Sequence, residues 1–354
     1  MKKVLVGICG IGNGHINRQI CVIKVLIEHG YKLLIATEKE KIETLKNIFP
    51  NEKIIELTIP WIVCDKDGLN YKETLNKYNN IDYFRKYLEF GINVEKELNG
   101  KPDLVISDYE PNVAQYAYSA NIPLITMEQQ SKFLYLDEIK IDNHSIEEEK
   151  YRLNYFFPRY DKKIISSFFP IDFEKSDVIQ VPPIISSISK KETKEDFILV
   201  YLSSYSNSYK YKKLLEIIRD LKNKEFKVYS NNYEEYEKEY SSSNIEYSNF
   251  NINFKNDLSI CSCLLATSGH QLISEAISLN IPIYVFPLET YEQHYNALMV
   301  EKYKLGTNKE ITKENIEEFI SKRKEYEENI IVYKKKYYKK SWEKTFIKEI
   351  NKII

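Results

Sequence analysis

The sequence predicts an α/β protein with two consecutive domains, each built on a parallel sheet. Short apolar runs of strand length alternate with longer segments whose apolar residues recur at helical spacing, and this alternation starts again in the second half. Two parallel strands joined by a helix need a right-handed crossover, so repeated units of this kind form a sheet covered by helices. The length of 354 residues also suits two domains of ordinary size.

The first half holds apolar runs that are bounded by turn residues. A glycine-rich turn follows the first run, and isoleucines then recur at helical spacing until Gly30, which predicts a helix that ends there. A second helix is expected between the third and fourth runs, over residues 113–119. The four expected strands are 4–9, 33–36, 104–107 and 124–126.

The same pattern returns after a loop that contains Pro182 and Pro183. Helices are expected over 214–221 and 271–279. The four expected strands of this half are 197–202, 226–229, 264–267 and 283–286. Prolines, serines and a charged stretch interrupt the periodicity between these halves. We therefore expect domains at 1–185 and 190–335 and a separate terminal helix at 336–354.

That terminal helix carries an apolar stripe with a basic start. Five apolar or aromatic residues lie four positions apart, and five lysines lie between Lys334 and Lys340. We expect the stripe to pack back on the N-terminal domain, because such stripes are usually buried. The alternative is a basic amphipathic helix lying on an anionic membrane. The stripe consists of Tyr338, Trp342, Phe346, Ile350 and Ile354.

Charge and hydropathy narrow the class of protein. Lysine plus arginine (51) nearly balances aspartate plus glutamate (52), which argues against nucleic-acid binding, since that needs a basic face. No run approaches the roughly 18 to 20 apolar residues of a membrane span. Met1 is followed within a few residues by a strand rather than by a secretion signal. We expect a soluble cytoplasmic protein, with peripheral membrane contact through the basic tail as the alternative.

The first glycine-rich turn is a candidate ligand loop. Glycines between a strand and a helix let the backbone expose helix N–H groups to a ligand. Gly10 and Gly12 fit the dinucleotide-binding pattern G-x-G-x-x-G, and Glu38 lies near the end of the second strand, which leaves a dehydrogenase as an alternative. The position of the third glycine, however, is occupied by His15. The pattern is therefore incomplete.

His15 and Asp108 are the candidate catalytic residues. Both follow predicted strands, at the carboxyl edge of the sheet where α/β proteins bind ligands. A histidine there can act as a general base, and a carboxylate can fix its tautomer. The alternatives are structural: His15 caps the helix or bonds to the loop, and Asp108 caps the helix that begins beside Pro111.

The second half carries a sharper pattern. Ser268, Gly269 and His270 come directly after a predicted strand and open a helix, whose N–H groups and dipole suit a diphosphate without requiring a metal ion. Glu275 lies two turns further on and can reach a ribose hydroxyl. After the next strand, carboxylate and amide groups suit the hydroxyls of a sugar. These groups are Glu292 and Gln293.

Taken in order, these segments resemble the GT-B nucleotide-sugar glycosyltransferases, including the UDP-glycosyltransferases and the bacterial cell-wall N-acetylglucosaminyltransferase. Residues 267–276, 281–287 and 292–297 resemble the donor-binding signature of that superfamily. Residues 10–18 and 102–111 resemble its acceptor-side segments. The resemblance implies a GT-B fold, in which two Rossmann-like domains face each other across a cleft.

The resemblance also implies a role for each matching residue. His15 is the base and Asp108 orients it, while Gly12, Asn13 and Gly14 form the acceptor-side loop. The remaining matches belong to the nucleotide-sugar donor, with Phe250 by the base. The chain lacks the tryptophan that follows the signature histidine in plant enzymes, which leaves the nucleobase open. The donor-binding matches are Ser203, Ser204, Phe250, Ser268, Gly269, His270, Gln271, Glu275, Glu292 and Gln293.

The implied activity is an inverting, metal-independent glycosyltransferase that uses a nucleoside-diphosphate sugar, with UDP expected, as co-substrate and needs no cofactor. Asp65 and Asp67 resemble a metal-binding pair but lie in a turn, so we expect no metal site. The acceptor is a small molecule, a glycan or a lipid-linked glycan, and it should contact the first domain around the aromatic stretches 61–90 and 133–167. The alternative for these stretches is that they are simply packed helices and loops of a tyrosine-rich chain. The alternatives are a nucleotide-sugar 2-epimerase and a catalytically inactive sugar-nucleotide or partner-binding protein.

Overall fold

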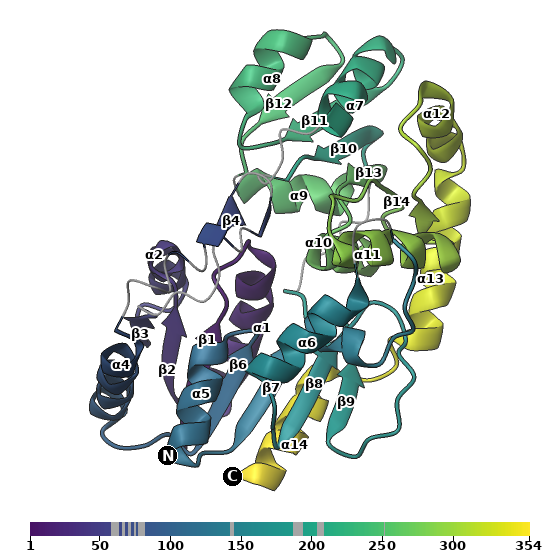
Figure 1. Ribbon diagram of the computed structural model, residues 1–354. Helices are drawn as coiled ribbons and strands as arrows, with labels where there is room; N and C mark the ends of the chain where they lie inside the picture. Colours follow the sequence, from purple (N-terminus) through teal and green to yellow (C-terminus); the bar gives the residue numbers. More distant parts are fainter. Residues whose placement is uncertain are drawn as a thin grey trace.

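The computed structural model describes residues 1–57, 82–141, 145–186, 194–203, 209–250 and 252–354, and the short pieces 64–65, 68–69, 72–73 and 76. Two parallel sheets lie one above the other along the molecule, each covered by helices (Figure 1). A separate two-stranded antiparallel ribbon joins β4 (Cys64–Asp65) to β5 (Gly68–Leu69). The α/β class and the two parallel sheets predicted from the sequence are therefore present.

The first sheet has seven strands, all parallel, in the order β3-β2-β1-β6-β7-β8-β9. Its inner strands are apolar and buried along almost their whole length, as expected for a parallel sheet covered on both faces. The strands are β1 (Lys3–Ile8), β2 (Lys32–Thr37), β3 (Lys53–Glu56), β6 (Leu104–Asp108), β7 (Leu124–Glu128), β8 (Lys162–Ser166) and β9 (Val178–Val181). The helices of this half are α1 (Gly14–Glu28), α2 (Lys39–Ile48), α4 (Tyr83–Leu98), α5 (Pro111–Ala120), η1 (Gln130–Leu134) and α6 (Ile146–Phe156).

The second sheet has six parallel strands in the order β12-β11-β10-β13-β14-β15. These strands are β10 (Phe197–Tyr201), β11 (Glu225–Tyr229), β12 (Ile245–Ser248), β13 (Cys263–Ala266), β14 (Ile283–Val285) and β15 (Gly306–Thr307). The helices that follow β10 are α7 (Tyr209–Asp220), α8 (Tyr233–Tyr240), α9 (Ile252–Ile260), α10 (His270–Ser278), α11 (Tyr291–Lys302), α12 (Lys313–Ser321), α13 (Arg323–Tyr337) and α14 (Trp342–Ile353).

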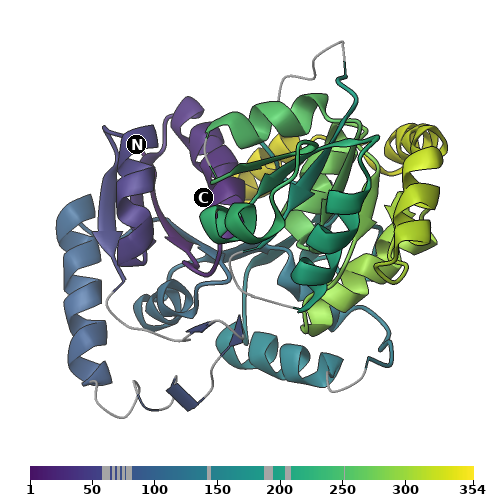
Figure 2. The same cartoon turned by 90° about the horizontal axis from the view of Figure 1, so that it is seen from above.

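Strand order reverses once in each sheet, between β1 and β6 in the first and between β10 and β13 in the second. Open α/β sheets bind ligands at such points, because the loops on either side turn in opposite directions and leave a crevice. Helix α1 follows β1, and α10 follows β13. The two helices meet: a Cβ added at Gly14 would lie 3.5 Å from the Cβ of Gln271. Figure 2 shows α1, in purple, against the green second domain.

The two domains share one apolar interface. A single cluster of buried side chains runs from the first sheet into α10, α11 and α13. Phe133 packs edge-on against Tyr291, with ring centroids 5.7 Å apart, and the Tyr333 hydroxyl donates to the Phe168 carbonyl at 2.7 Å. The two domains are therefore packed directly against each other.

Helix α14 packs against the first sheet, as Figure 1 shows at the lower end of the molecule. Phe346 and Ile350 are fully buried among side chains of the first sheet and α1. Glu349 Oε2 lies 3.3 Å from Lys162 Nζ in β8. The apolar stripe that a membrane-bound helix would insert is thus used for packing. Across the described residues, no helix combines the length and apolar character needed to span a bilayer.

We expect Phe346→Ala to lower the free energy of unfolding by about 3 to 5 kcal/mol, because it leaves a cavity under a helix that closes the first core. Urea denaturation followed by circular dichroism measures the change. Lys348→Ala, an exposed position on the same helix, is the matched control and should stay within about 0.5 kcal/mol of the parent. Equal effects at the two positions would contradict the packing of this stripe.

Candidate active site

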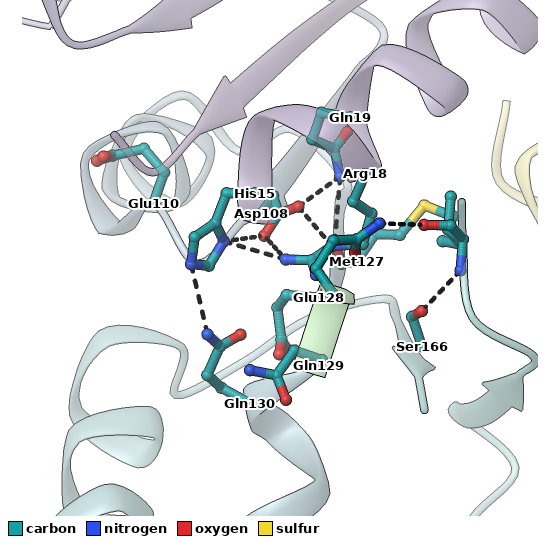
Figure 3. A network of polar contacts seen from close by, with 12 residues as sticks. His15, Arg18, Gln19, Asp108, Glu110, Met127, Glu128, Gln129, Gln130 and Ser166 are labelled. Carbon is teal, nitrogen blue, oxygen red and sulfur yellow. Dashed lines mark hydrogen bonds and ion pairs between the residues drawn. The ribbon is translucent and has the colours of Figure 1, made fainter. Parts of the chain in front are cut away.

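His15 and Asp108 meet at the edge of the first sheet. Asp108 is the last residue of β6, and it pairs in register with Ile8, the last residue of β1, so the two strands end side by side. The loop after β1 leads into α1, and His15 lies in the first turn of that helix. His15 Nδ1 and Asp108 Oδ1 are 2.7 Å apart (Figure 3). Both side chains are buried, with His15 retaining 8% exposure.

The geometry does not support the alternative in which His15 and Asp108 only cap helices. Helix α5 is capped by Glu110, whose carboxylate accepts from the Asn112 N–H at 2.8 Å, rather than by Asp108. The cap position of α1 is Asn13, which makes no side-chain capping bond. His15 therefore uses its ring for side-chain contacts, and Asp108 is directed into the site.

Two further polar side chains hold Asp108. Arg18 donates from Nε to Oδ2 at 2.8 Å and from Nη2 to Oδ1 at 2.6 Å, and Gln19 donates to Oδ2 at 2.8 Å. Both residues lie on α1, one turn after His15, and both are buried. Arg18 Nη2 also lies 3.0 Å from His15 Nδ1, as expected when two donors converge on the same carboxylate oxygen. The carboxylate thus accepts from three side chains.

Burial alone would raise the pKa of Asp108, because it removes water from the charged form. The positive charge of Arg18 and the contact with His15 outweigh that cost, and the pKa lies below its usual value. The carboxyl group is therefore ionised at neutral pH although it is fully buried. An ionised partner is what a histidine needs if its Nδ1 is to carry the proton and its Nε2 the lone pair.

Tyr109 occupies strained backbone beside this pair. Its φ is 53°, in the left-handed region that a bulky residue rarely adopts. The strain turns its ring onto His15, nearly parallel to the imidazole with centroids 6.0 Å apart, while its hydroxyl donates to Glu149 at 2.6 Å. Gln130 approaches from η1, with its amide nitrogen 3.4 Å from His15 Nε2. The imidazole ring of His15 is thus contacted on one face by Tyr109 and at its two nitrogens by Asp108 and Gln130.

The N-terminus of α10 faces the first domain and is open. Gly269, its N-cap residue, has φ −65° and ψ 130°, which any residue adopts, and a Cβ added there meets nothing within 4 Å. No side chain caps this terminus. By contrast, Thr290 caps α11. The glycine is therefore not demanded by its own backbone, and its missing side chain leaves space beside the free N–H groups.

His270 is the first residue of α10, and its two ring nitrogens differ. The Phe168 N–H donates to Nε2 at 3.3 Å, so Nε2 carries the lone pair and Nδ1 the proton. Burial, with the positive charges of Lys132 and Arg18, holds the pKa of His270 well below its usual value. The ring is neutral, and its Nδ1 is buried without a hydrogen-bond partner among the described residues. A buried orphan donor at an uncapped helix end is suited to an anionic ligand.

Ser268 and Gln293, both expected to contact the donor, instead bind each other. The Ser268 N–H donates to Gln293 Oε1 at 3.1 Å, and its hydroxyl donates to the Gln293 carbonyl at 2.8 Å. The Leu288 N–H also donates to Gln293 Oε1, at 3.0 Å. Both hydrogens of Ser268 are therefore used, and Gln293 has only its amide NH2 left for a sugar. In this arrangement Ser268 braces the two loops that carry α10 and α11, and its expected phosphate contact stays a prediction.

The other expected donor residues lie around the same edge. Glu275 is buried in the second turn of α10, which raises its pKa, and it accepts from Gln271 at 3.3 Å. Glu292 is half-buried in the first turn of α11. Phe250, just after β12, packs on Tyr201 at the end of β10, with centroids 4.9 Å apart.

Some expected residues fall at or beyond the limits of the described chain. Ser203 follows β10, and its carbonyl accepts from the Tyr211 hydroxyl at 3.3 Å, while Ser204 lies outside the described residues. Much of the expected acceptor stretch 61–90 and residue Asp67 lie outside them too. Among the residues that are described, no three histidine, cysteine or carboxylate side chains gather as a metal site would require.

A family of known proteins matches most of the chain. The family model of glycosyl transferase family 1 matches residues 2–323. The chain belongs to this family. It is a glycosyltransferase rather than a dehydrogenase, the alternative that the first glycine-rich turn had left open. A search of curated proteins finds no match.

Solved structures share the fold of this family 1 chain at low sequence identity. A UDP-glucosyltransferase from Polygonum tinctorium, in complex with 3,4-dichloroaniline, is 14% identical with a TM-score of 0.71, and the match covers 99% of this chain and 98% of that one. UGT2 of Phytolacca americana, complexed with UDP-2fluoro-glucose and pterostilbene, is 12% identical with a TM-score of 0.72 over 99% of both chains. The glycosyltransferase VinC, in complex with dTDP, is 12% identical with a TM-score of 0.66 over 99% of both. The GT-B fold is thus that of this chain.

Several site residues of this family 1 chain were not assigned a role from its sequence. Arg18, Gln19, Tyr109 and Gln130 all contact His15 or Asp108. One signal was present for the first two, since positions three and four after a first-turn histidine lie on the same face of a helix. The backbone strain of Tyr109 and the approach of Gln130 from η1 leave no trace in a sequence.

We expect Arg18→Met to lower the free energy of unfolding by about 3 kcal/mol at pH 7.5, because it leaves a buried carboxylate without its cation. The folded-state pKa of Asp108 is depressed, so this stabilisation is present above the unfolded value of about 3.9 and is lost as pH falls. In the variant the carboxyl takes up a proton at higher pH than in the parent. The difference between variant and parent should therefore shrink at pH 5.

Urea denaturation at the two pH values measures this difference. Arg18→Lys is the matched control, since it keeps the charge but loses the two-pronged contact, and it should lose less. A loss from Arg18→Met that is the same at both pH values would show that Arg18 supports the fold by packing rather than by its charge.

We expect Gly269→Ala to fold with unchanged stability, within about 0.5 kcal/mol, because its backbone is unstrained and the new Cβ meets no atom. The same Cβ should weaken nucleoside-diphosphate binding by about tenfold or more, since it intrudes on the open helix end. Calorimetric titration and thermal denaturation measure the two effects. Gly7→Ala is the contrasting control: its Cβ would lie 2.3 Å from a methyl carbon of Val113 and should destabilise the fold.

Proposed function

We propose that the protein transfers a sugar from a nucleoside-diphosphate sugar, with UDP as the expected nucleotide, to an acceptor hydroxyl, with inversion at the anomeric carbon. The observation that carries the proposal is the 2.7 Å contact between His15 Nδ1 and Asp108 Oδ1. It leaves the lone pair on His15 Nε2, and general base catalysis of this kind contributes about 10² to 10⁴-fold. The family membership supports sugar transfer as the overall reaction.

In this mechanism the acceptor hydroxyl loses its proton to His15 Nε2 as its oxygen bonds to the anomeric carbon. The bond from that carbon to the β-phosphate oxygen breaks, and its electron pair stays on the departing diphosphate. The open N-terminus of α10 and the Nδ1–H of His270 are suited to that charge. Because fixed donors offset the charge, the reaction proceeds without a divalent metal ion.

The structural neighbours guide the choice of nucleotide and acceptor class. One structural neighbour is complexed with UDP-2fluoro-glucose and another with dTDP. The Polygonum tinctorium enzyme is capable of glucosylating indoxyl and is in complex with 3,4-dichloroaniline. The Phytolacca americana enzyme is in complex with pterostilbene. These small aromatic molecules are therefore the first acceptors to test. Glu275 and Glu292 would bind ribose and donor-sugar hydroxyls, respectively.

We expect His15→Ala to reduce transfer by about 10² to 10⁴-fold, because it removes the proton acceptor. Release of UDP from UDP-glucose, UDP-galactose and UDP-N-acetylglucosamine, with and without those acceptors, measures the rate. His29→Ala is the matched control: it changes the other histidine of the α1 region, which only caps the helix end through Val25. A rate for His15→Ala equal to that of His29→Ala would refute the base assignment.

The same assay separates the remaining choices. NMR of the glycoside should show the anomeric configuration opposite to that of the donor, and EDTA should leave the rate unchanged. A retained configuration would rule out single displacement. Conversion of the donor to an epimer without acceptor would indicate the 2-epimerase, and donor binding without turnover would indicate the inactive binding protein.

A further inference from the structure

Lys132 is a buried cation that no carboxylate contacts among the described residues. It lies in η1, just after β7, and its side chain is fully buried. Nζ donates to the side-chain oxygen of Gln129 and lies 4.8 Å from the ring centroid of Phe133 and 5.7 Å from that of Phe169. Throughout the described part of the chain, no carboxylate oxygen comes within 4.0 Å of it. Lysine is rarely buried in this way, because desolvating its charge is costly.

The surroundings of Lys132 lie where the two domains pack against each other. Phe133, its nearest aromatic neighbour, packs against Tyr291 in the first turn of α11. The positive charge of Lys132 helps to lower the pKa of His270 at the start of α10, second only to burial. Among the carboxylates that act on Lys132 itself, Glu292 of α11 has the strongest influence. Phe169, the other ring beside the ammonium group, stacks on Tyr295 of α11, and the neighbouring Phe168 donates its N–H to His270 of α10. Lys132 therefore lies on the side of the first domain that packs against α10 and α11.

We propose that Lys132 binds the diphosphate of the nucleotide-sugar donor, as the first domain's counterpart to the helix terminus of α10. The inference rests on the proposed function and adds a charged phosphate ligand to it. Gly269 leaves room at that terminus, and His270 Nδ1 offers an unused donor there. An ammonium group on the other side would offset the negative charge that grows on the β-phosphate as the sugar leaves.

The titration of Lys132 is consistent with this role. Burial lowers its pKa to about 8, so the side chain is mostly charged at neutral pH and becomes neutral above that value. An anion bound beside it would raise the pKa again, because it favours the charged form. Diphosphate affinity should therefore fall as pH rises from 7 to 9.5. The charged groups that act on Lys132 are Glu292 of α11, Glu128 of β7, Arg18 of α1 and Glu149 of α6, with His270 of α10 affected in turn.

The chain provides a matched control in a second buried lysine. Lys163 in β8 is equally buried, and its pKa is also lowered to about 8 by burial. Its Nζ, however, donates to two hydroxyls, Ser131 Oγ at 2.9 Å and Thr126 Oγ1 at 3.2 Å. It lies over the ring of Tyr160, 4.4 Å from the centroid. Its charge is thus satisfied within the first domain.

The experiment compares nucleoside diphosphates with nucleosides on the full chain. Calorimetric titration with UDP and uridine, and with the dTDP–thymidine and GDP–guanosine pairs, is carried out on the parent, Lys132→Met and Lys163→Met. We expect Lys132→Met to weaken the diphosphate by about ten- to a hundredfold, the range of a charge-assisted hydrogen bond, and to leave the nucleoside within about twofold. Lys163→Met should bind both ligands as the parent does. The pH dependence above 7 should be lost only in Lys132→Met.

Every other result of these titrations would contradict either the role of Lys132 or the proposed function. Unchanged diphosphate affinity in Lys132→Met, an equal loss for nucleoside and diphosphate, or an equal loss in Lys163→Met would overturn the role of Lys132. Nucleoside binding and thermal denaturation show whether Lys132→Met is folded, and removing an unpaired buried charge should not lower its melting temperature. A parent that binds no nucleoside diphosphate would refute the proposed function and this inference with it. A parent that binds one tightly but transfers no sugar would refute only the reaction.

Discussion

The site depends on keeping one carboxylate charged in a place that water does not reach. Asp108 is fully buried, and burial by itself would favour its neutral form. Arg18 reverses that preference with two hydrogen bonds, Gln19 adds a third, and His15 then receives a partner of fixed charge and position. The cation has a cost of its own, since a buried guanidinium is stable only while the carboxylate remains. The site and the local stability of the first domain are therefore coupled.

The second domain offers uncharged hydrogen-bond donors where the departing diphosphate is proposed to bind. The end of α10 has no capping side chain, no Cβ at Gly269 and a neutral His270, whose Nδ1 proton meets no acceptor in the part of the chain that the structure describes. Ser268 and Gln293 use their polar atoms to hold the surrounding loops still. The result is a set of preorganised donors that need not reorient when negative charge develops. A base held by a charged carboxylate on one side and neutral donors on the other suit the two ends of a single displacement.

The sequence predicted the strands that are apolar on both faces and missed those at the sheet margins. The runs at 4–9, 104–107 and 264–267 coincide with β1, β6 and β13, because such runs are typical of inner parallel strands. By contrast, β8 begins with two lysines and β15 has only two residues. Tertiary packing buries Lys163 of β8 although its side chain is charged. Edge and short strands give weak periodicity, so their place emerges only from pairing with a neighbour.

By itself, the sequence determined the order of units, the two glycine-containing turns and the residue types at the carboxyl ends of the strands. Local pattern suffices for these features, because each depends on a few neighbouring residues. The tertiary structure alone decided that Asp108 reaches His15, since that requires β1 and β6, about a hundred residues apart in the chain, to be adjacent in the sheet. It also decided that Ser268 braces a loop and that Lys132 lies on the side of the first domain that packs against α10 and α11. Contacts between distant segments depend on strand order and domain packing, which no short pattern of residues encodes.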